Sequence, residues 1–172
     1  MNIQNLNCLI DLHLHLDGSL PLHTVKELAA QQGITLQMTD GELKKKLSVP
    51  AGCRDLNEYL TKFEFPLTLM QTPEALEKCM HDLLTELEGQ GVQYCEVRFA
   101  PQLHTQKGMS QNEVIEAVKA GLYSVAGVKP ESIHAGIILC CMRGSDNGQQ
   151  NKITVEEAAR HLGSGVCAVD LA

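Results

Sequence analysis

The chain is poor in aromatic residues and lacks a long hydrophobic run, and both absences narrow what it can be. Of its 172 residues none is Trp and only three each are Phe and Tyr, while the formal net charge is −7. Nucleic-acid binding relies on basic patches and aromatic stacking, so this acidic composition predicts no nucleic-acid partner. A membrane helix needs about 18 or more consecutive apolar residues. The sequence has no such run, and we expect no membrane partner.

Two further absences concern secretion and disulfide bonding. The N-terminus shows neither the basic start nor the apolar stretch of a signal peptide, so we expect a cytoplasmic protein. The seven cysteines are an odd number without paired spacing, which argues against a disulfide or zinc–thiolate framework. Five of them lie in apolar, strand-like runs, where a free cysteine behaves as a small hydrophobe. We predict reduced core residues at Cys8, Cys95, Cys140, Cys141 and Cys167.

One short segment carries the strongest chemical signal. Residues 10–17 read Ile-Asp-Leu-His-Leu-His-Leu-Asp, and side chains on a β-strand alternate between its two faces. On that pattern Asp11, His13, His15 and Asp17 share one face. The opposite face is apolar and consists of Ile10, Leu12, Leu14 and Leu16. The segment therefore predicts a buried strand whose polar face lines a site.

The two histidines of this strand are suited to binding a metal ion. Imidazoles two residues apart on one strand face point in the same direction, and neutral imidazole is a good zinc ligand. We predict His13 and His15 as metal ligands, the alternative being histidines that are hydrogen-bonded within the core. The other histidines show no ligand-type spacing, and we expect them on the surface or around the site. These are His23, His81, His104, His134 and His161.

Strand-like and helix-like segments alternate along the chain. Strands are predicted at about 8–16, 92–99, 133–142 and 166–171. Helices are predicted at about 21–32, 73–89, 110–126 and 154–163, the last two starting at capping boxes, with a polar loop over 143–151. A helical insertion covers about residues 34–69, with short helices around 40–47 and 55–63. This alternation is typical of βαβ units around a parallel sheet, and we predict one domain over residues 1–172.

The second predicted strand favours a barrel over an open sheet. Tyr94, Glu96 and Arg98 share one of its faces, and Val97 and Phe99 share the other. A sheet interior that accepts charged side chains near a strand end is typical of a barrel, whose functional site lies at that end. The alternative is a structural ion pair between Glu96 and Arg98.

Five motifs in order resemble the adenosine deaminase family of metal-dependent amidohydrolases. They lie at residues 13–20 (His-Leu-His-Leu-Asp-Gly-Ser-Leu), 59–63, 97–101, 138–143 and 168–172, and so extend over essentially the whole chain. The resemblance implies an α/β fold that is the first half, about four βα units, of a (β/α)8 TIM-type barrel. The helical insertion would follow the first strand–helix unit. The implied activity is zinc-dependent hydrolytic deamination of adenosine to inosine and ammonia, a reaction of purine salvage.

The resemblance also implies roles for individual residues. His13 and His15 would hold one Zn²⁺ per complete site, with His15 also beside the purine nucleoside substrate. Asp17 would accept a hydrogen bond from a ribose hydroxyl, or alternatively cap the turn that follows it. Asp rather than Glu at this position favours a nucleoside over the free base adenine. An apolar wall over the base would consist of Leu56, Tyr59, Leu60 and Phe63, which are alternatively ordinary core residues of a helix.

The family's remaining zinc ligands and its catalytic acid have no counterpart in this sequence. We therefore assign no catalytic residue and expect the chain alone to be inactive. Open parallel edges invite pairing with another chain, so a complementary C-terminal half or a second copy is the expected protein partner. The alternatives are a non-catalytic half-barrel module for assembly or nucleoside binding, or a fragment of an adenine or modified-nucleoside deaminase.

Overall fold

The computed structural model describes residues 8–172 and shows one parallel sheet with strand order β1-β2-β3-β4. The strands are β1 (Leu9–His15), β2 (Val92–Phe99), β3 (His134–Cys141) and β4 (Val166–Leu171). All four lie where the sequence predicts them. Residues 1–7, where we predict no signal peptide, lie outside the described residues.

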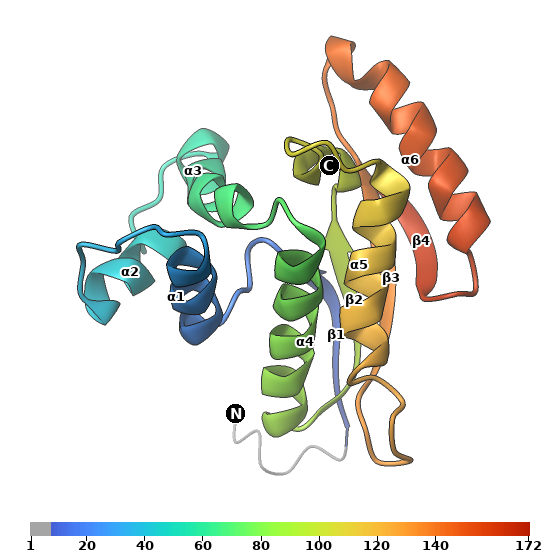
Figure 1. Ribbon diagram of the computed structural model, residues 1–172, viewed down its shortest axis with the longest axis horizontal. Helices are drawn as coiled ribbons and strands as arrows, with labels where there is room; N and C mark the ends of the chain where they lie inside the picture. The colour runs from blue at the N-terminus through green and yellow to red at the C-terminus, as the bar shows by residue number, and fades with distance from the viewer. Residues whose placement is uncertain (1–7) are drawn as a thin grey trace.

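Helices follow each of the first three strands and also fill the predicted insertion. They are α1 (Leu22–Gln31), α2 (Asp40–Leu47), α3 (Leu56–Leu69), α4 (Pro73–Gly89), α5 (Gln111–Tyr123) and α6 (Gly148–His161), with short 3₁₀ turns η2 (Pro101–His104) and η3 (Ser145–Asn147). Figure 1 shows α4 and α5 side by side in front of the sheet, with α6 next to them. Helices α1, α2 and α3 form a separate group, and α3 lies toward the end of the sheet where the strands terminate.

The core lies between the sheet and these helices. In β2 the side chains of Cys95, Val97 and Phe99 are buried, while the alternate positions are only partly covered. From α4 an apolar stripe with helical spacing packs onto them, consisting of Leu76, Met80, Leu83, Leu84 and Leu87. Burying each such side chain stabilises the fold by about 1.5–3 kcal/mol. The alternating burial along β2 confirms that Tyr94, Glu96 and Arg98 occupy the face of the sheet opposite the core.

Side-chain caps start most of the predicted helices at the expected residues. The Thr72 hydroxyl accepts a hydrogen bond from the Ala75 N–H at 3.3 Å, and Pro73 occupies the first turn of α4. At α5, Ser110 and Glu113 form the predicted capping box. These two helix starts are confirmed.

Three helix boundaries differ from the prediction. Helix α6 begins at Gly148 rather than near Thr154, so the predicted second capping box and most of the predicted loop are wrong. Thr154 is buried inside α6 instead, where its hydroxyl donates to Gln111 Oε1 at 2.7 Å. Helix α3 continues past Phe63 to Leu69, and α5 ends at Tyr123. A local sequence signal cannot distinguish a capping threonine from one whose hydroxyl bonds to a neighbouring helix.

Several expectations about cysteine and histidine burial also need correction. All seven cysteines are free, but Cys8 and Cys167 are exposed rather than in the core. Conversely, His104 and His161 are buried, which excludes the surface location for these two histidines. Over residues 8–172, none of the helices has the length and apolar character needed to cross a bilayer.

Candidate metal centre and substrate pocket

Strand β1 brings the rings of His13 and His15 together near its carboxyl end. The ring centroids are 5.4 Å apart and the ring planes are tilted by 49°. Burial, followed by the charges of Arg98 and His13, lowers the pKa of His15 below its usual 6.5. A lowered pKa keeps this imidazole neutral at neutral pH, which is the form that binds a metal ion.

The regular alternation predicted for β1 is wrong because the strand contains an irregularity. Asp11 is in register with the buried Cys95 and Leu14 with Val97, so one extra residue on β1 lies between these pairs. The Asp11 carboxylate accepts a hydrogen bond from the His13 N–H at 2.9 Å. Such a bulge shifts the side-chain alternation. Asp11 therefore does not share the face of the histidines.

The same irregularity changes the apolar face of β1. Ile10 and Leu12 are 58% and 56% exposed, whereas Leu16 is fully buried. The prediction of one continuous buried apolar face is therefore wrong for the first half of the strand. The exposed pair lies on a sheet edge, since β1 pairs only with β2 among the described strands.

The residues of this chain fit part of a zinc site. A catalytic zinc ion usually has three protein ligands and a water molecule, and imidazole nitrogen is a preferred donor. His13 and His15 supply two such donors from one strand. Within residues 8–172 there is no cluster of three or more His, Cys, Asp or Glu side chains that could hold a metal ion. The donor chemistry suits zinc, and the two imidazoles account for part of its usual ligand set.

Asp17, directly after β1, offers an unused hydrogen-bond acceptor. It is only 6% exposed, and its Oδ1 atom has no hydrogen-bond partner among the described residues. Burial raises the pKa of Asp17 to about 6, against the opposing effects of the Asp17 and Gly18 backbone N–H groups and of Arg98. A buried carboxylate oxygen without a donor is costly, so a ligand hydroxyl would satisfy it. This agrees with the ribose contact predicted for Asp17, which stays a prediction.

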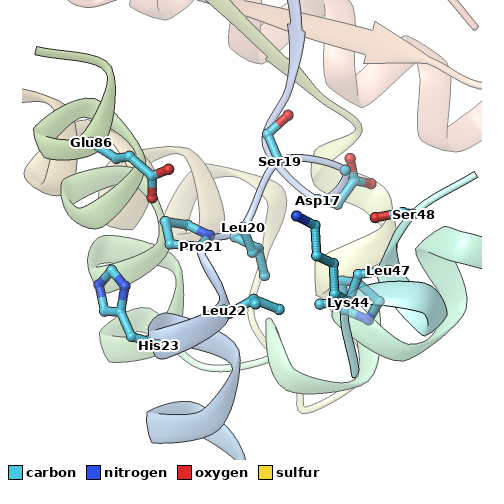
Figure 2. Close-up of a pocket in the computed structure, with 12 residues that line it drawn as sticks. Asp17, Ser19, Leu20, Pro21, Leu22, His23, Lys44, Leu47, Ser48 and Glu86 are labelled. Atoms are coloured by element: carbon cyan, nitrogen blue, oxygen red, sulfur yellow. The ribbon is translucent and has the colours of Figure 1, made fainter. Parts of the chain in front are cut away.

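A cavity of about 510 Å³ opens beside Asp17. Figure 2 shows the Lys44 side chain extending from α2 toward Asp17, with Ser19 and Ser48 nearby. The remaining wall includes the apolar Leu20, Leu22, Leu47 and Pro66 and the polar His23 and Glu86, but neither His13 nor His15. A volume of this size is within the range of small-molecule sites, which combine an apolar lining with a few polar groups.

Of the predicted apolar wall on α3, one residue reaches the histidines. The Phe63 ring packs edge-on against His15 with 5.6 Å between centroids, and the Tyr59 ring contacts Phe63 at 5.6 Å with its plane tilted by 50°. Leu56 and Leu60 are 68% and 49% exposed and do not line the cavity beside Asp17. Their role over a purine base stays a prediction.

Gly18 allows Phe63 to approach His15 this closely. A Cβ atom on Gly18 would lie 2.9 Å from Phe63 Cε1 and 3.3 Å from His15 Cβ. We expect Gly18→Ala to push the Phe63 ring away from His15 and to lower the free energy of unfolding by about 1 kcal/mol. The changed ring-current shift of the His15 ring protons in NMR spectra would report the movement.

The matched control is Gly41→Ala in α2, because a Cβ atom there meets only Thr39 Oγ1 at 4.0 Å. Alanine favours a helix over glycine, so this variant should be as stable as the parent or slightly more stable. An unchanged His15 signal in Gly18→Ala would contradict the predicted displacement.

Sequence reasoning missed the polar contacts that link three strands at the site. Arg98 on β2 forms an ion pair with Asp170 on β4, and its Nη1 atom lies 3.2 Å from His13 Nε2 on β1. Glu96 instead accepts a hydrogen bond from the Tyr94 hydroxyl at 3.0 Å. The suggested Glu96–Arg98 ion pair is therefore wrong. Alternation on β2 identified Arg98, but its partner is 72 positions further along the chain and carries no local signal.

The four parallel strands with their helices form half of a parallel α/β barrel, with the paired imidazoles near the carboxyl end of β1. An adenine deaminase from Arthrobacter aurescens has this fold with a TM-score of 0.77 at 21% identity, over 95% of this chain and 48% of that chain. A zinc-bound amidohydrolase from Burkholderia ambifaria gives a TM-score of 0.74 at 15% identity, over 96% and 44% of the two chains. The four parallel strands therefore match half of an adenosine deaminase-type TIM barrel, as the sequence predicts.

Sequence comparison identifies the family. The adenosine deaminase family model matches residues 8–172. An adenosine deaminase from Haemophilus ducreyi is 48% identical over 168 residues, which is 95% of this chain and 48% of that protein. Another from Clostridium perfringens is 39% identical over 173 residues, or 100% and 51% of the two chains. The chain belongs to the adenosine deaminase family, and it spans about half the length of the curated relatives it matches.

Proposed function

We propose that this chain serves the zinc-dependent hydrolytic deamination of adenosine to inosine and ammonia, as the first half of a complete barrel. The observation that carries the proposal is the pair of imidazoles, His13 and His15, beside Asp17, whose Oδ1 atom lacks a hydrogen-bond partner among the described residues, in a chain of this family. The free cysteines agree with a reducing compartment such as the cytoplasm.

Each residue has a defined task in this proposal. His13 and His15 hold the zinc ion, which when bound lowers the pKa of a water molecule to about 7 and so supplies a nucleophile at neutral pH. Asp17 accepts a hydrogen bond from the ribose and orients the nucleoside. Phe63, packed on His15, excludes water from one side of the base. Proton transfer to the purine is left to groups outside this chain.

Exposed apolar surface at both sheet edges supports association with a complementary half. Leu12 on β1 and Val169 and Leu171 on β4 are 56%, 45% and 56% exposed. Between α6 and β4 lies an apolar hollow of about 280 Å³ lined by Val155, Leu162 and Val169, among others. Parallel sheets are normally covered on both faces, so these surfaces are suited to further strands and helices. We propose the second half of the barrel as their partner, ahead of a second copy of this chain.

Reconstitution tests the function. The full chain is co-expressed with the C-terminal half of the Haemophilus ducreyi relative, loaded with zinc, and mixed with adenosine. We expect inosine and ammonia in equal amounts from the mixture and none from this chain alone. His15→Ala should abolish the activity, whereas His134→Ala, at the exposed start of β3, should retain it.

The same preparation separates the alternatives. Adenine and N6-methylated nucleotides are tested beside adenosine, and preference for either would favour the adenine or modified-nucleoside deaminase alternative. Light scattering reports whether the two halves associate. A folded, associated pair that binds zinc but converts none of these substrates would contradict the proposed activity and favour a non-catalytic half-barrel.

A further inference from the structure

The Arg98 side chain contacts one of the proposed zinc ligands at the atom that could bind the metal. Its Nη1 lies 3.2 Å from His13 Nε2, and its Nη2 pairs with Asp170 Oδ2. The side chains of Arg98 and Asp170 are 12% and 27% exposed, so water screens this bridge only weakly. The guanidinium therefore lies between β1 and β4, at the carboxyl ends of the strands.

The contact fixes the state of the His13 ring. Arginine has only donors, so His13 Nε2 must be the unprotonated acceptor in this hydrogen bond. A divalent metal ion needs the same lone pair on nitrogen. One lone pair cannot serve both cations, and two cations this close also repel each other. Binding of a metal ion at His13 Nε2 thus requires Arg98 to move.

The ion pair with Asp170 leaves one donor and one acceptor unused, and these can form a new hydrogen bond when Arg98 moves. Arg98 Nε and Asp170 Oδ1 are both buried, and neither has a hydrogen-bond partner among residues 8–172. Arginine and a carboxylate pair best through two parallel hydrogen bonds. A small rotation that withdraws Nη1 from His13 can bring the Nε–H group to Oδ1. The bond lost to His13 is then replaced by a second bond to Asp170.

We propose that Arg98 is an internal competitor for zinc, occupying the lone pair of His13 until a divalent ion displaces it toward Asp170. This inference rests on the proposed metal role of His13 and His15. It explains why a cationic side chain lies against a metal ligand. Metal binding then also adds a second hydrogen bond between Arg98 on β2 and Asp170 on β4.

The test replaces Arg98 by lysine. A lysine ammonium keeps a charge beside Asp170, but as a single nitrogen on a shorter side chain it cannot span to His13 as well. We expect Arg98→Lys to bind Zn²⁺ about tenfold more tightly than the parent, which is the size of one hydrogen bond to a charged group. Competition with a chromophoric chelator measures the affinity. Arg160→Lys, which alters the pair between the exposed Arg160 and the buried Glu157, is the control and should leave the affinity unchanged.

Two further measurements separate the possible outcomes. Adding His13→Ala to Arg98→Lys should remove the gain, since exposed thiols such as Cys8 and Cys167 also bind zinc. In the unmodified chain, which requires no variant to fold, Zn²⁺ should shift the NMR signal of the Arg98 Nε–H as it bonds to Asp170. An affinity that is unchanged or weaker in Arg98→Lys, or an unmoved Nε–H signal in the zinc-loaded chain, overturns the competitor role. No His13-dependent zinc binding by the co-expressed pair of halves would instead overturn the metal role of the histidine pair, and the competitor role with it.

Discussion

Replacing Gly121 by alanine is expected to lower the free energy of unfolding by about 3 kcal/mol, roughly two orders of magnitude in the folding equilibrium. Gly121 lies in α5 where that helix crosses α4, and a Cβ atom there would lie 2.2 Å from the Glu77 carbonyl oxygen and 2.9 Å from Met80 Cβ. Because the nearest obstacle is backbone, no side-chain rotation relieves the clash. The two helices have to move apart, which also loosens their contacts with the sheet.

The effect opposes the intrinsic preference of the helix. Alanine inside a helix is favoured over glycine by up to about 1 kcal/mol, so a measured loss understates the steric cost. Gly89→Ala in α4 is the control, since a Cβ atom there meets nothing within 4 Å. We expect that variant to stay within about 0.5 kcal/mol of the parent in urea unfolding. Equal stability of the two variants would contradict this prediction, because it would mean that α4 and α5 can move apart at Gly121 without a large loss of stability.

The second large effect is an acid sensitivity caused by His104. Its ring is fully buried, Nδ1–H donates to the Met70 carbonyl at 2.9 Å, and Nε2 has no partner among the described residues. Burial lowers its pKa from 6.5 to about 4, although the Met70 bond acts in the opposite direction. Protonation would place a charge with an unpaired N–H in the core, next to the Phe99 ring.

The sign of the pH effect follows from the two pKa values. Between pH 6.5 and about 4 the unfolded chain binds a proton at His104 that the folded chain does not. Above pH 6.5, His104 therefore does not reduce the free energy of unfolding. As the pH falls below 6.5 this free energy decreases progressively, by about 2 kcal/mol at pH 5. Asp17, whose pKa is raised to about 6, acts in the opposite direction, so a variant is needed to isolate His104.

His104→Asn provides that comparison because its amide can still donate to the Met70 carbonyl but does not titrate. The variant should be less stable than the parent at neutral pH, since asparagine leaves a small cavity. Its free energy of unfolding should, however, fall by about 2 kcal/mol less than that of the parent between pH 7.5 and 5. His134→Asn, at an exposed position, should behave like the parent. Urea unfolding at the two pH values decides, and parallel losses in parent and His104→Asn would refute the assignment.

Strands and most helix starts could be predicted because their signals are local. Caps such as Thr72 and Ser110 act on backbone groups three residues away, and the apolar stripe of α4 repeats every three or four residues. Thr154 has the same local signal but does not cap a helix, because its hydroxyl donates a hydrogen bond to Gln111 on a neighbouring helix. Local patterns therefore identify helices well, but they do not show which polar side chains form hydrogen bonds with residues distant in the sequence.

The site was predictable only in part for a similar reason. The histidine pair stands out because both residues belong to one strand. The bulge after Asp11 is accompanied by a hydrogen bond from the His13 N–H to the Asp11 carboxylate, and no spacing rule indicates it. The Arg98–Asp170 pair depends on the order of strands in the sheet, which brings β2 and β4 to either side of β3. His104, at the end of η2, is buried against the end of α3, where its ring bonds to the Met70 carbonyl.

The strand order has a consequence for how the chain folds during its synthesis. Each strand pairs with the one made just before it, so every new βα unit adds to an edge that already exists. A ribosome releases the N-terminal units first, at about 5–20 residues per second. The nascent chain can thus assemble this sheet in the order of translation, since β2, β3 and β4 each find their partner strand already made.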